Sequence, residues 1–246
     1  MWNAALWGGI SGSAVLIGAV LALFMKIPKA LIGWIMAFGT GVLIGAATYE
    51  LLGDSADDSG LTPTIIGFLA GALVFTVFDW YISRKGGAGR KRSVRVSGGS
   101  AQEKSGGMAI FTGTVLDAIP ESIMLGASLI AGKGVSLLLV IAIFISNIPE
   151  GLSSTAGMKS DGYTKKRIVL LWSSVLLITI VATVGGYLFM EHVSDYATAI
   201  IASFAGGGII AMVCSSMMPE AYEDGGSITG FVAALGLLCS LILDHM

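Results

Sequence analysis

The stretch LDAIPESI, residues 116 to 123, places two carboxylic acids inside one of the most apolar segments of the chain. Asp117 and Glu121 are four residues apart, with Pro120 between them. Residues at this spacing lie on one face of a helix, so both side chains would present oxygen atoms to the same side. Pro120 cannot donate a hydrogen bond to the carbonyl of Leu116, which leaves a further oxygen acceptor beside the acids. The stretch therefore predicts a polar site on an apolar helix.

A related stretch, SNIPEGL at residues 146 to 152, follows twenty-nine residues later. Ser146 and Glu150 repeat the four-residue spacing, Pro149 again precedes the acid, and Asn147 adds an amide. The short linker between the two apolar segments makes them antiparallel neighbours. The two motifs are therefore expected to converge on one site.

The composition around these motifs indicates a membrane protein. The 246 residues are 54% hydrophobic and only 12% charged, with a mean hydropathy of +0.84, whereas a soluble domain carries about 25% charged residues. Crossing a bilayer takes roughly 20 apolar residues, and eight segments of that kind are present. The predicted spans are residues 4–25, 31–52, 62–82, 107–131, 134–158, 167–190, 195–219 and 226–245. We expect an all-α polytopic membrane protein with one transmembrane domain, residues 1–246, in the cell (plasma or inner) membrane.

The basic residues predict the orientation. If the N-terminus lies outside, thirteen of the fourteen Lys and Arg residues fall on the inside, and Lys133 alone falls outside. Basic loops stay in the cytoplasm, so both termini are expected outside. The basic stretch 83–106 is then a cytoplasmic loop between the third and fourth spans, and it is interpreted as a topology signal and not as a nucleic-acid contact.

Two pairs of segments resemble each other. FGTGVLIGA begins at Phe38 and FAGGGIIAM at Phe204, while GFLAGALVF begins at Gly67 and GFVAALGLL at Gly230. The offsets of 166 and 163 residues are nearly equal, and spans two and seven cross in opposite directions. This is the signature of an inverted repeat, here of spans 1–3 and 6–8 around the central pair 4–5.

Depth favours a cation at the paired motifs. Asp117, Glu121 and Glu150 are the acids expected near mid-membrane, since Asp117 lies ten residues into its span and a helix rises about 1.5 Å per residue. No Lys or Arg falls in the middle of any span, so a salt bridge is not available to offset the cost of burying the charge. Protonation, a water-filled cavity and a bound cation remain as options, and the clustered oxygens favour the cation.

The two motifs resemble those of the ZIP (Zrt/Irt-like protein) family of divalent-metal transporters, in its bacterial GufA-like branch. That family carries motifs close to H-N-x-P-E-G and H/Q-N-x-P-E-G in its fourth and fifth spans. This chain has D-A-I-P-E-S at 117–122 and S-N-I-P-E-G at 146–151. Glu121, Asn147 and Glu150 match by residue type, whereas Asp117 and Ser146 match by position only.

The resemblance implies inward transport of a divalent cation and a homodimer. The implied metal ligands are Asp117, Glu121, Ser146, Asn147 and Glu150. Ala118 replaces a family Asn, and the sixth span offers Thr179 where many members carry Glu, so one well-formed metal site is expected where the family often has two.

Oxygen ligands suit Mn²⁺, Mg²⁺ and Fe²⁺, and carboxylates also bind Zn²⁺. The metal is the substrate, and no organic cofactor and no enzymatic activity are expected. Further acids suggest a path through the membrane. The cation would enter past Glu50, Asp54, Asp57 and Asp58, and leave past Asp79, Glu220, Glu223 and Asp224.

Three other functions fit the same residues. A proton-coupled carrier of a small organic solute could use the carboxylates as a proton relay. A non-transporting metal sensor would need only the binding site. An intramembrane enzyme is less well supported, because the sequence has no HExxH motif, no Ser–His arrangement and no mid-span His.

Overall fold

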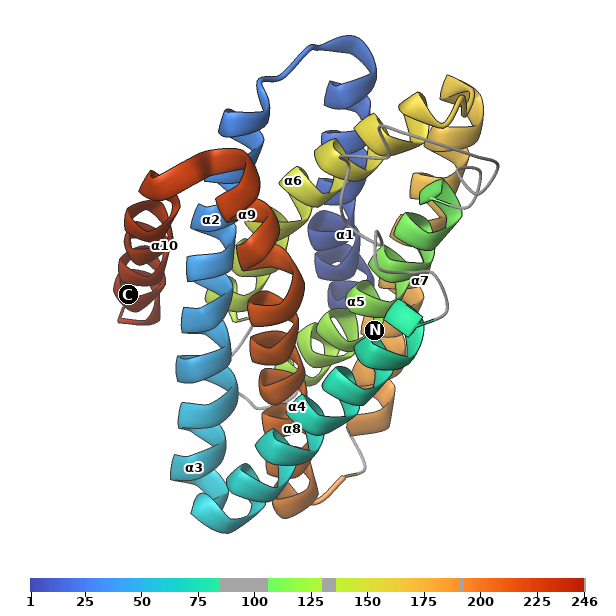
Figure 1. Cartoon of the computed structure of the whole chain (residues 1–246). Helices are drawn as coiled ribbons and strands as arrows, with labels where there is room; N and C mark the ends of the chain where they lie inside the picture. Colours follow the sequence, from blue (N-terminus) through green and yellow to red (C-terminus); the bar gives the residue numbers. More distant parts are fainter. Residues whose placement is uncertain (85–105, 130–135, 191–192, 246) are drawn as a thin grey trace.

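The computed structural model is helical throughout the residues that it describes, which are 1–84, 106–129, 136–190 and 193–245, and that part of the chain contains no strand (Figure 1). Residues 85–105 of the predicted basic loop lie outside the described residues. The elements are α1 (Trp2–Phe24), α2 (Lys29–Ala46), η1 (Ala47–Gly53), α3 (Asp54–Ser59), α4 (Leu61–Arg84), α5 (Gly106–Ser128), α6 (Leu137–Ser160), α7 (Lys165–Met190), α8 (Asp195–Met212), η4 (Val213–Met217), α9 (Met218–Gly225), η5 (Gly226–Ile228) and α10 (Thr229–Asp244).

Six helical stretches of the described chain are long and apolar enough to cross a membrane. They are Trp2–Phe24, Lys29–Ser59, Leu61–Tyr81, Leu137–Ser160, Lys165–Met190 and Asp195–Asp244. Large apolar side chains cover their outer faces, as shown by Leu69, which is 61% exposed, and Val181, which is 71% exposed. Exposed apolar surface on this scale indicates contact with lipid. The prediction of a polytopic helical membrane protein is thereby confirmed.

The helices pack as two groups of four. The first bundle consists of α1, α5, α6 and α7, in which α1 packs against both α6 and α7, and α5 packs against α7. The second bundle consists of α2, α4, α8 and α10, in which α4 packs along α8 and α10 packs along α2. The two bundles meet mainly where α2 packs along α6 (Figure 1). Buried apolar side chains fill this meeting place, including Leu43, Leu125 and Ile143.

Glycines allow the helices to cross with their backbones nearly in contact. A Cβ atom on Gly41 of α2 would lie 1.9 Å from the carbonyl oxygen of Ala233 in α10. A Cβ atom on Gly71 of α4 would lie 1.8 Å from the carbonyl oxygen of Phe204 in α8. Small residues at such crossings let transmembrane helices pack closely in lipid. These crossings account for part of the high glycine content.

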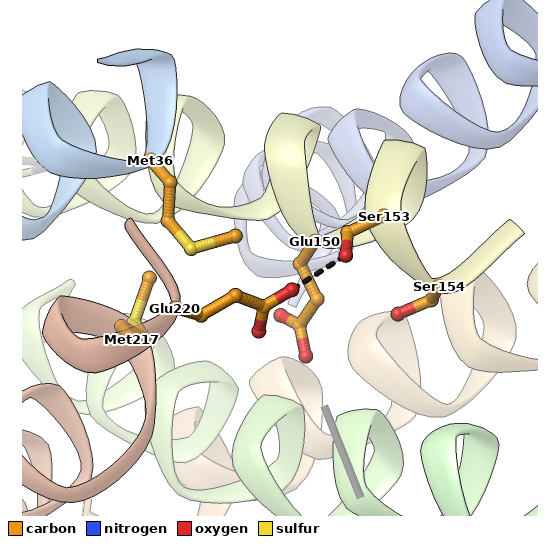
Figure 2. Close-up of a pocket in the computed structure, with 6 residues that line it drawn as sticks. All are labelled: Met36, Glu150, Ser153, Ser154, Met217 and Glu220. Carbon is orange, nitrogen blue, oxygen red and sulfur yellow. Dashed lines mark hydrogen bonds between the residues drawn. The ribbon is translucent and has the colours of Figure 1, made fainter. Parts of the chain in front are cut away.

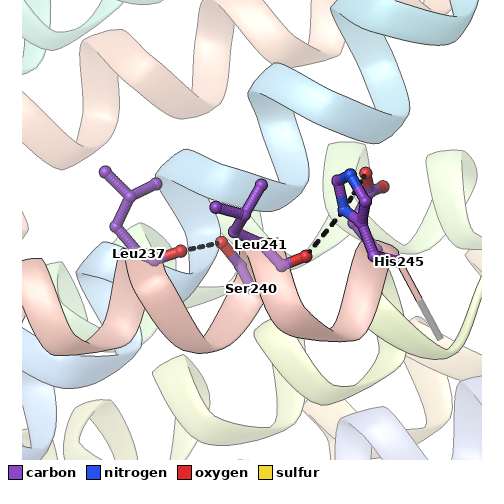
Figure 3. Close-up of polar contacts among 5 residues, drawn as sticks. Leu237, Ser240, Leu241 and His245 are labelled. Carbon is purple, nitrogen blue, oxygen red and sulfur yellow. Dashed lines mark hydrogen bonds and ion pairs between the residues drawn. The ribbon is translucent and has the colours of Figure 1, made fainter.

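The helix α10 packs along α2 in the second bundle, and two polar side chains near its C-terminal end interact with carbonyl oxygens of the same helix. The Ser240 hydroxyl donates to the carbonyl oxygen of Leu237 at 2.7 Å, and a ring nitrogen of the exposed His245 lies 2.9 Å from that of Leu241 (Figure 3). Gly45 of α2 packs directly against the Ser240 side chain. In lipid a hydroxyl must find a protein partner, and the preceding turn of the same helix supplies one here.

Candidate metal site

The two motif helices, α5 and α6, pack against each other in the first bundle. Both remain continuous through their internal prolines, Pro120 and Pro149. The Ser136 hydroxyl accepts a hydrogen bond from the Leu139 amide at 3.0 Å and fixes the start of α6, as N-cap residues do. A proline inside each helix leaves a carbonyl without its usual helical donor, so both helices carry an additional oxygen acceptor near the acids.

Glu150 lies at the contact between the two motif helices. Its side chain is 8% exposed. One carboxylate oxygen, Oε1, accepts a hydrogen bond of 2.9 Å from the hydroxyl of Thr114, a buried residue of α5. A hydrogen bond to a charged acceptor is stronger than one between neutral groups. Thr114 therefore holds the Glu150 carboxylate toward α5.

A second acid, Glu220 of α9, reaches the same place from the other bundle. Glu220 is also 8% exposed, and its Oε1 accepts a hydrogen bond of 2.5 Å from the hydroxyl of Ser153 on α6. The carboxylates of Glu150 and Glu220 point toward each other across a small cavity (Figure 2). The cavity has a volume of about 10 Å³, and its lining is Met36, Glu150, Ser153, Ser154, Met217 and Glu220. Such a volume holds roughly one water molecule or one ion.

The other predicted ligands are buried in the same two helices. Glu121, Ser146 and Asn147 are all buried, and the Ser146 hydroxyl donates to the carbonyl oxygen of Ile143 at 3.1 Å. Asp117 lies in α5, but its side chain falls outside the described residues. Within the side chains that are described, no group of three or more His, Cys, Asp or Glu residues comes together.

The residues predicted to line the path lie at several levels of the fold. Glu50 falls in η1, a π-helical turn that continues α2, and Asp54 begins the short helix α3. Asp79 is half-buried near the end of α4. The hydroxyl of the buried Thr179 donates to the carbonyl oxygen of Val175, and its side chain packs against Gly12 of α1. Thr179 thus faces the α1–α7 contact.

The remaining path residues, Glu223 and Asp224, lie on α9, one turn beyond Glu220. Glu223 is exposed and Asp224 is half-buried. They lie beside the cytoplasmic end of the path as the sequence predicts it, while Glu220 itself turns inward to the cavity. The sequence placed all three acids on the exit path, but in the structure Glu220 lines the buried cavity, whereas Glu223 and Asp224 do not.

Sequence reasoning placed Glu220 on the exit path and gave no role to Thr114 or Ser153. A signal for Glu220 was present, because Met218-Pro219-Glu220 repeats the x-P-E pattern of Ile119-Pro120-Glu121 and Ile148-Pro149-Glu150. No comparable signal marks Thr114 or Ser153, because a hydroxyl on an apolar helix usually bonds to the preceding turn of its own helix.

The fold and this cavity define a helical membrane protein with buried acids between two bundles. No family model matches the chain. It is 26% identical over 211 residues to a putative zinc transporter of Arabidopsis thaliana, and the aligned region covers 85% of this chain and 33% of the relative. It is 25% identical over 133 residues to a zinc transporter of Caenorhabditis elegans, and this aligned region covers 51% of the chain and 28% of that relative.

The chain thus spans about a third of the length of these curated relatives. Their names agree with the resemblance carried by the two x-P-E-x motifs. Together these likenesses support membership of the ZIP family, as the motifs indicated.

Proposed function

We propose that this chain moves a divalent metal cation, such as zinc, manganese or iron, into the cytoplasm through a carboxylate site near the midplane on α5 and α6. The observation that carries the proposal is the pair of buried carboxylates, Glu150 and Glu220, that face one small cavity (Figure 2). Glu121, Ser146, Asn147 and Asp117 are the further proposed ligands on the same two helices. The names of the two relatives, a putative zinc transporter and a zinc transporter, agree with this function.

Electrostatics favours a cation in this cavity. Two carboxylates in a low-dielectric region repel each other, and a proton or a bound cation relieves that repulsion. A metal ion also binds several oxygens at once, which suits a cavity that is lined by two acids and two serines. Met36 and Met217 add two thioether side chains to the lining (Figure 2). Thioethers are soft ligands, and they favour transition metals over Mg²⁺.

The proposed architecture has eight spans in one domain. The sixth apolar stretch, Asp195–Asp244, has 50 residues, which at about 1.5 Å per residue is far longer than a bilayer core of about 30 Å. It contains the turn at Gly226, whose φ is 71°, so α8 with α9 would make one crossing and α10 another. Counted with α5, whose 23 residues suffice for a span, the stretches give eight.

An inverted repeat of spans 1–3 and 6–8 is supported by matching irregularities. A π-helical turn interrupts each of the two long helices, at Ala47–Gly53 and at Val213–Met217. Each of these helices then ends at a glycine with positive φ, Gly60 in one half and Gly226 in the other. π-Helical turns are uncommon, so their recurrence at corresponding places in the two halves favours two copies of one structural unit.

The helix crossings support the same repeat. Gly41 packs against Ala233 and Gly236 against Phe38, and the corresponding pairs in the other half are Gly207 against Phe68 and Gly71 against Phe204. The crossings make Gly236 and Gly71 equivalent positions of the two halves, whereas the sequence match made Gly230 equivalent to Gly67.

The first bundle has a similar set of crossings. Gly18 packs against Ile148 and Gly151 against Val15, while Gly186 packs against Ile123 and Gly126 against Thr183.

The proposed orientation places the basic turns in the cytoplasm. Lys26 and Lys29 flank the α1–α2 turn, and Lys165, Lys166 and Arg167 begin α7. Both turns lie at the same end of the molecule (Figure 1), which is the arrangement that the positive-inside rule requires. Asp54, Asp57 and Asp58 on α3 lie at the opposite end. Both termini would then be outside, in a plasma or inner membrane, with the chain acting as a homodimer.

Uptake by the purified full chain in liposomes tests the proposed function. Zn²⁺, Mn²⁺, Fe²⁺ and Mg²⁺ are offered separately, and entry into vesicles is followed with a metal-sensitive dye. We expect saturable uptake of at least one transition metal, and less uptake of Mg²⁺. Uptake no greater than that of empty liposomes for all four ions would refute metal transport.

A further inference from the structure

The two serines in the cavity wall differ in how their hydroxyls are bonded. The Ser153 hydroxyl donates to the Glu220 carboxylate. Ser154, the next residue of α6, is 5% exposed and forms no hydrogen bond with any group in the described part of the chain. Its hydroxyl points toward the Glu150 carboxylate from the wall of the cavity (Figure 2). The Ser154 oxygen is therefore available to an ion or a molecule in the cavity.

A buried hydroxyl without a partner is unusual in a membrane helix. Such hydroxyls usually donate to a carbonyl one turn earlier in their own helix, as those of Ser11, Thr40 and Thr179 do here. Among the described residues, the buried serines without a hydrogen bond are Ser154 and Ser203, and Ser154 is the one that lines the cavity. An unpaired buried polar group is costly, and a ligand bound to its oxygen would offset that cost.

Ser154 shares a face of α6 with two of the proposed metal ligands. Ser146, Glu150 and Ser154 follow one another at intervals of four residues, and this spacing places side chains on one face of a helix. Each interval is about 6 Å along the helix axis. Because α6 ends at the basic turn before α7, Ser154 lies beyond Glu150 on the cytoplasmic side in the proposed orientation.

We propose that the Ser154 hydroxyl oxygen is a ligand of the divalent cation in this cavity, beside the carboxylates of Glu150 and Glu220. The proposal rests on the proposed transport function, in which the cation passes through the cavity. The hydroxyls of Thr114 and Ser153 donate to the two carboxylates and hold them in place, whereas no described group competes for the Ser154 oxygen. Two carboxylates balance the charge of a divalent cation, and a neutral third oxygen completes more of its coordination without adding charge.

A change of ligand atom tests the proposal. Ser154→Cys places a sulfur where the oxygen lies, and thiolates prefer soft cations such as Cd²⁺ to the harder Mn²⁺. The full chain also carries Cys214→Ser and Cys239→Ser, so that one thiol remains. We expect a cadmium–thiolate charge-transfer band in the ultraviolet spectrum of the purified protein. The ratio of Cd²⁺ affinity to Mn²⁺ affinity should rise by roughly tenfold.

Ser11→Cys in the same background is the matched control. Ser11 is a fully buried serine of α1, and its hydroxyl donates to the carbonyl oxygen of Gly8. This variant should show no charge-transfer band and no change in the affinity ratio. The proposal is wrong if Ser154→Cys gives no more charge-transfer absorption with Cd²⁺ than Ser11→Cys.

Ser154→Ala distinguishes a ligand from a structural residue, and it decides the question if the cysteine variant fails to fold. Alanine removes an unpaired polar group, so the melting temperature of the metal-free protein should not fall. Mn²⁺ binding, measured by calorimetry in detergent, should weaken by about tenfold. Unchanged Mn²⁺ affinity would overturn the proposal.

These binding measurements do not depend on transport. Weaker binding by Ser154→Ala in a chain that takes up no metal would support the Ser154 ligand and refute metal transport. Metal uptake with unchanged binding by Ser154→Ala would refute the Ser154 ligand alone. A wild-type chain that binds neither Cd²⁺ nor Mn²⁺ would refute the ligand as well.

Discussion

Glu150→Gln should lower the rate of metal uptake at low metal concentration by at least about 100-fold. The amide keeps the size of the side chain and can still accept the hydrogen bond from Thr114, but it removes one negative charge from the cavity that Glu150 shares with Glu220. Losing a buried charged partner costs several kcal/mol, and each 1.4 kcal/mol corresponds to a factor of ten in affinity. Initial uptake rates in liposomes measure the effect.

The matched control for this substitution is Asp195→Asn. Asp195 begins α8, is exposed, and is not among the residues expected to line the path. Substitutions at exposed positions have small effects, so uptake should change by less than about twofold. Gel-filtration profiles of both variants should match that of the wild type. Equal uptake by Glu150→Gln and Asp195→Asn would remove Glu150 from the transport path.

Gly71→Ala should lower the melting temperature of the purified protein by about 5–10 °C. A Cβ atom at this position would lie 1.8 Å from the carbonyl oxygen of Phe204, so α4 and α8 would have to move apart. Overpacking of this kind costs about 1–3 kcal/mol, and in a chain of this size each kcal/mol lowers the melting temperature by roughly 2–4 °C. Thermal unfolding in detergent, followed by tryptophan fluorescence, measures the shift.

Gly230→Ala provides the control for the glycine prediction. Among the described residues, no atom outside the local helix backbone lies within 4 Å of a Cβ atom built on Gly230, and alanine favours a helix over glycine. Its melting temperature should equal or exceed that of the wild type. A Gly71→Ala variant as stable as Gly230→Ala would contradict the close crossing of α4 and α8.

The transmembrane helices could be predicted from sequence because bilayer thickness dictates their length. The predicted spans 4–25 and 62–82 correspond closely to α1 (Trp2–Phe24) and α4 (Leu61–Arg84). The π-helical turns of the long helices could not be predicted, since a change from α to π spacing leaves no mark on the hydrophobic pattern. The extension of these helices beyond the apolar segments, into α3 and α9, depends on tertiary packing against α8 and α2.

The candidate site was predictable only in part. An acid four residues from another polar group, next to a proline, is unusual in an apolar segment, and this made Glu121 and Glu150 recognisable from sequence. Both residues are buried, which agrees with side chains that point into the protein and not toward lipid. The position of Glu220 depends on the tertiary packing of α9 against α2, which brings its carboxylate within hydrogen-bond distance of Ser153 on α6. That is a contact between residues 67 positions apart, and no local pattern specifies it.

The central claim is that a metal cation binds between Glu150 and its neighbours in the cavity shared by the two bundles. Anomalous diffraction at the zinc absorption edge, from crystals of the full chain grown with Zn²⁺, tests it most directly. The account predicts an anomalous peak in the cavity at about 2.0–2.2 Å from a carboxylate oxygen of Glu150, and its loss in Glu150→Gln. A chain that transports zinc but shows its peaks only elsewhere, with none beside Glu150, would contradict the account.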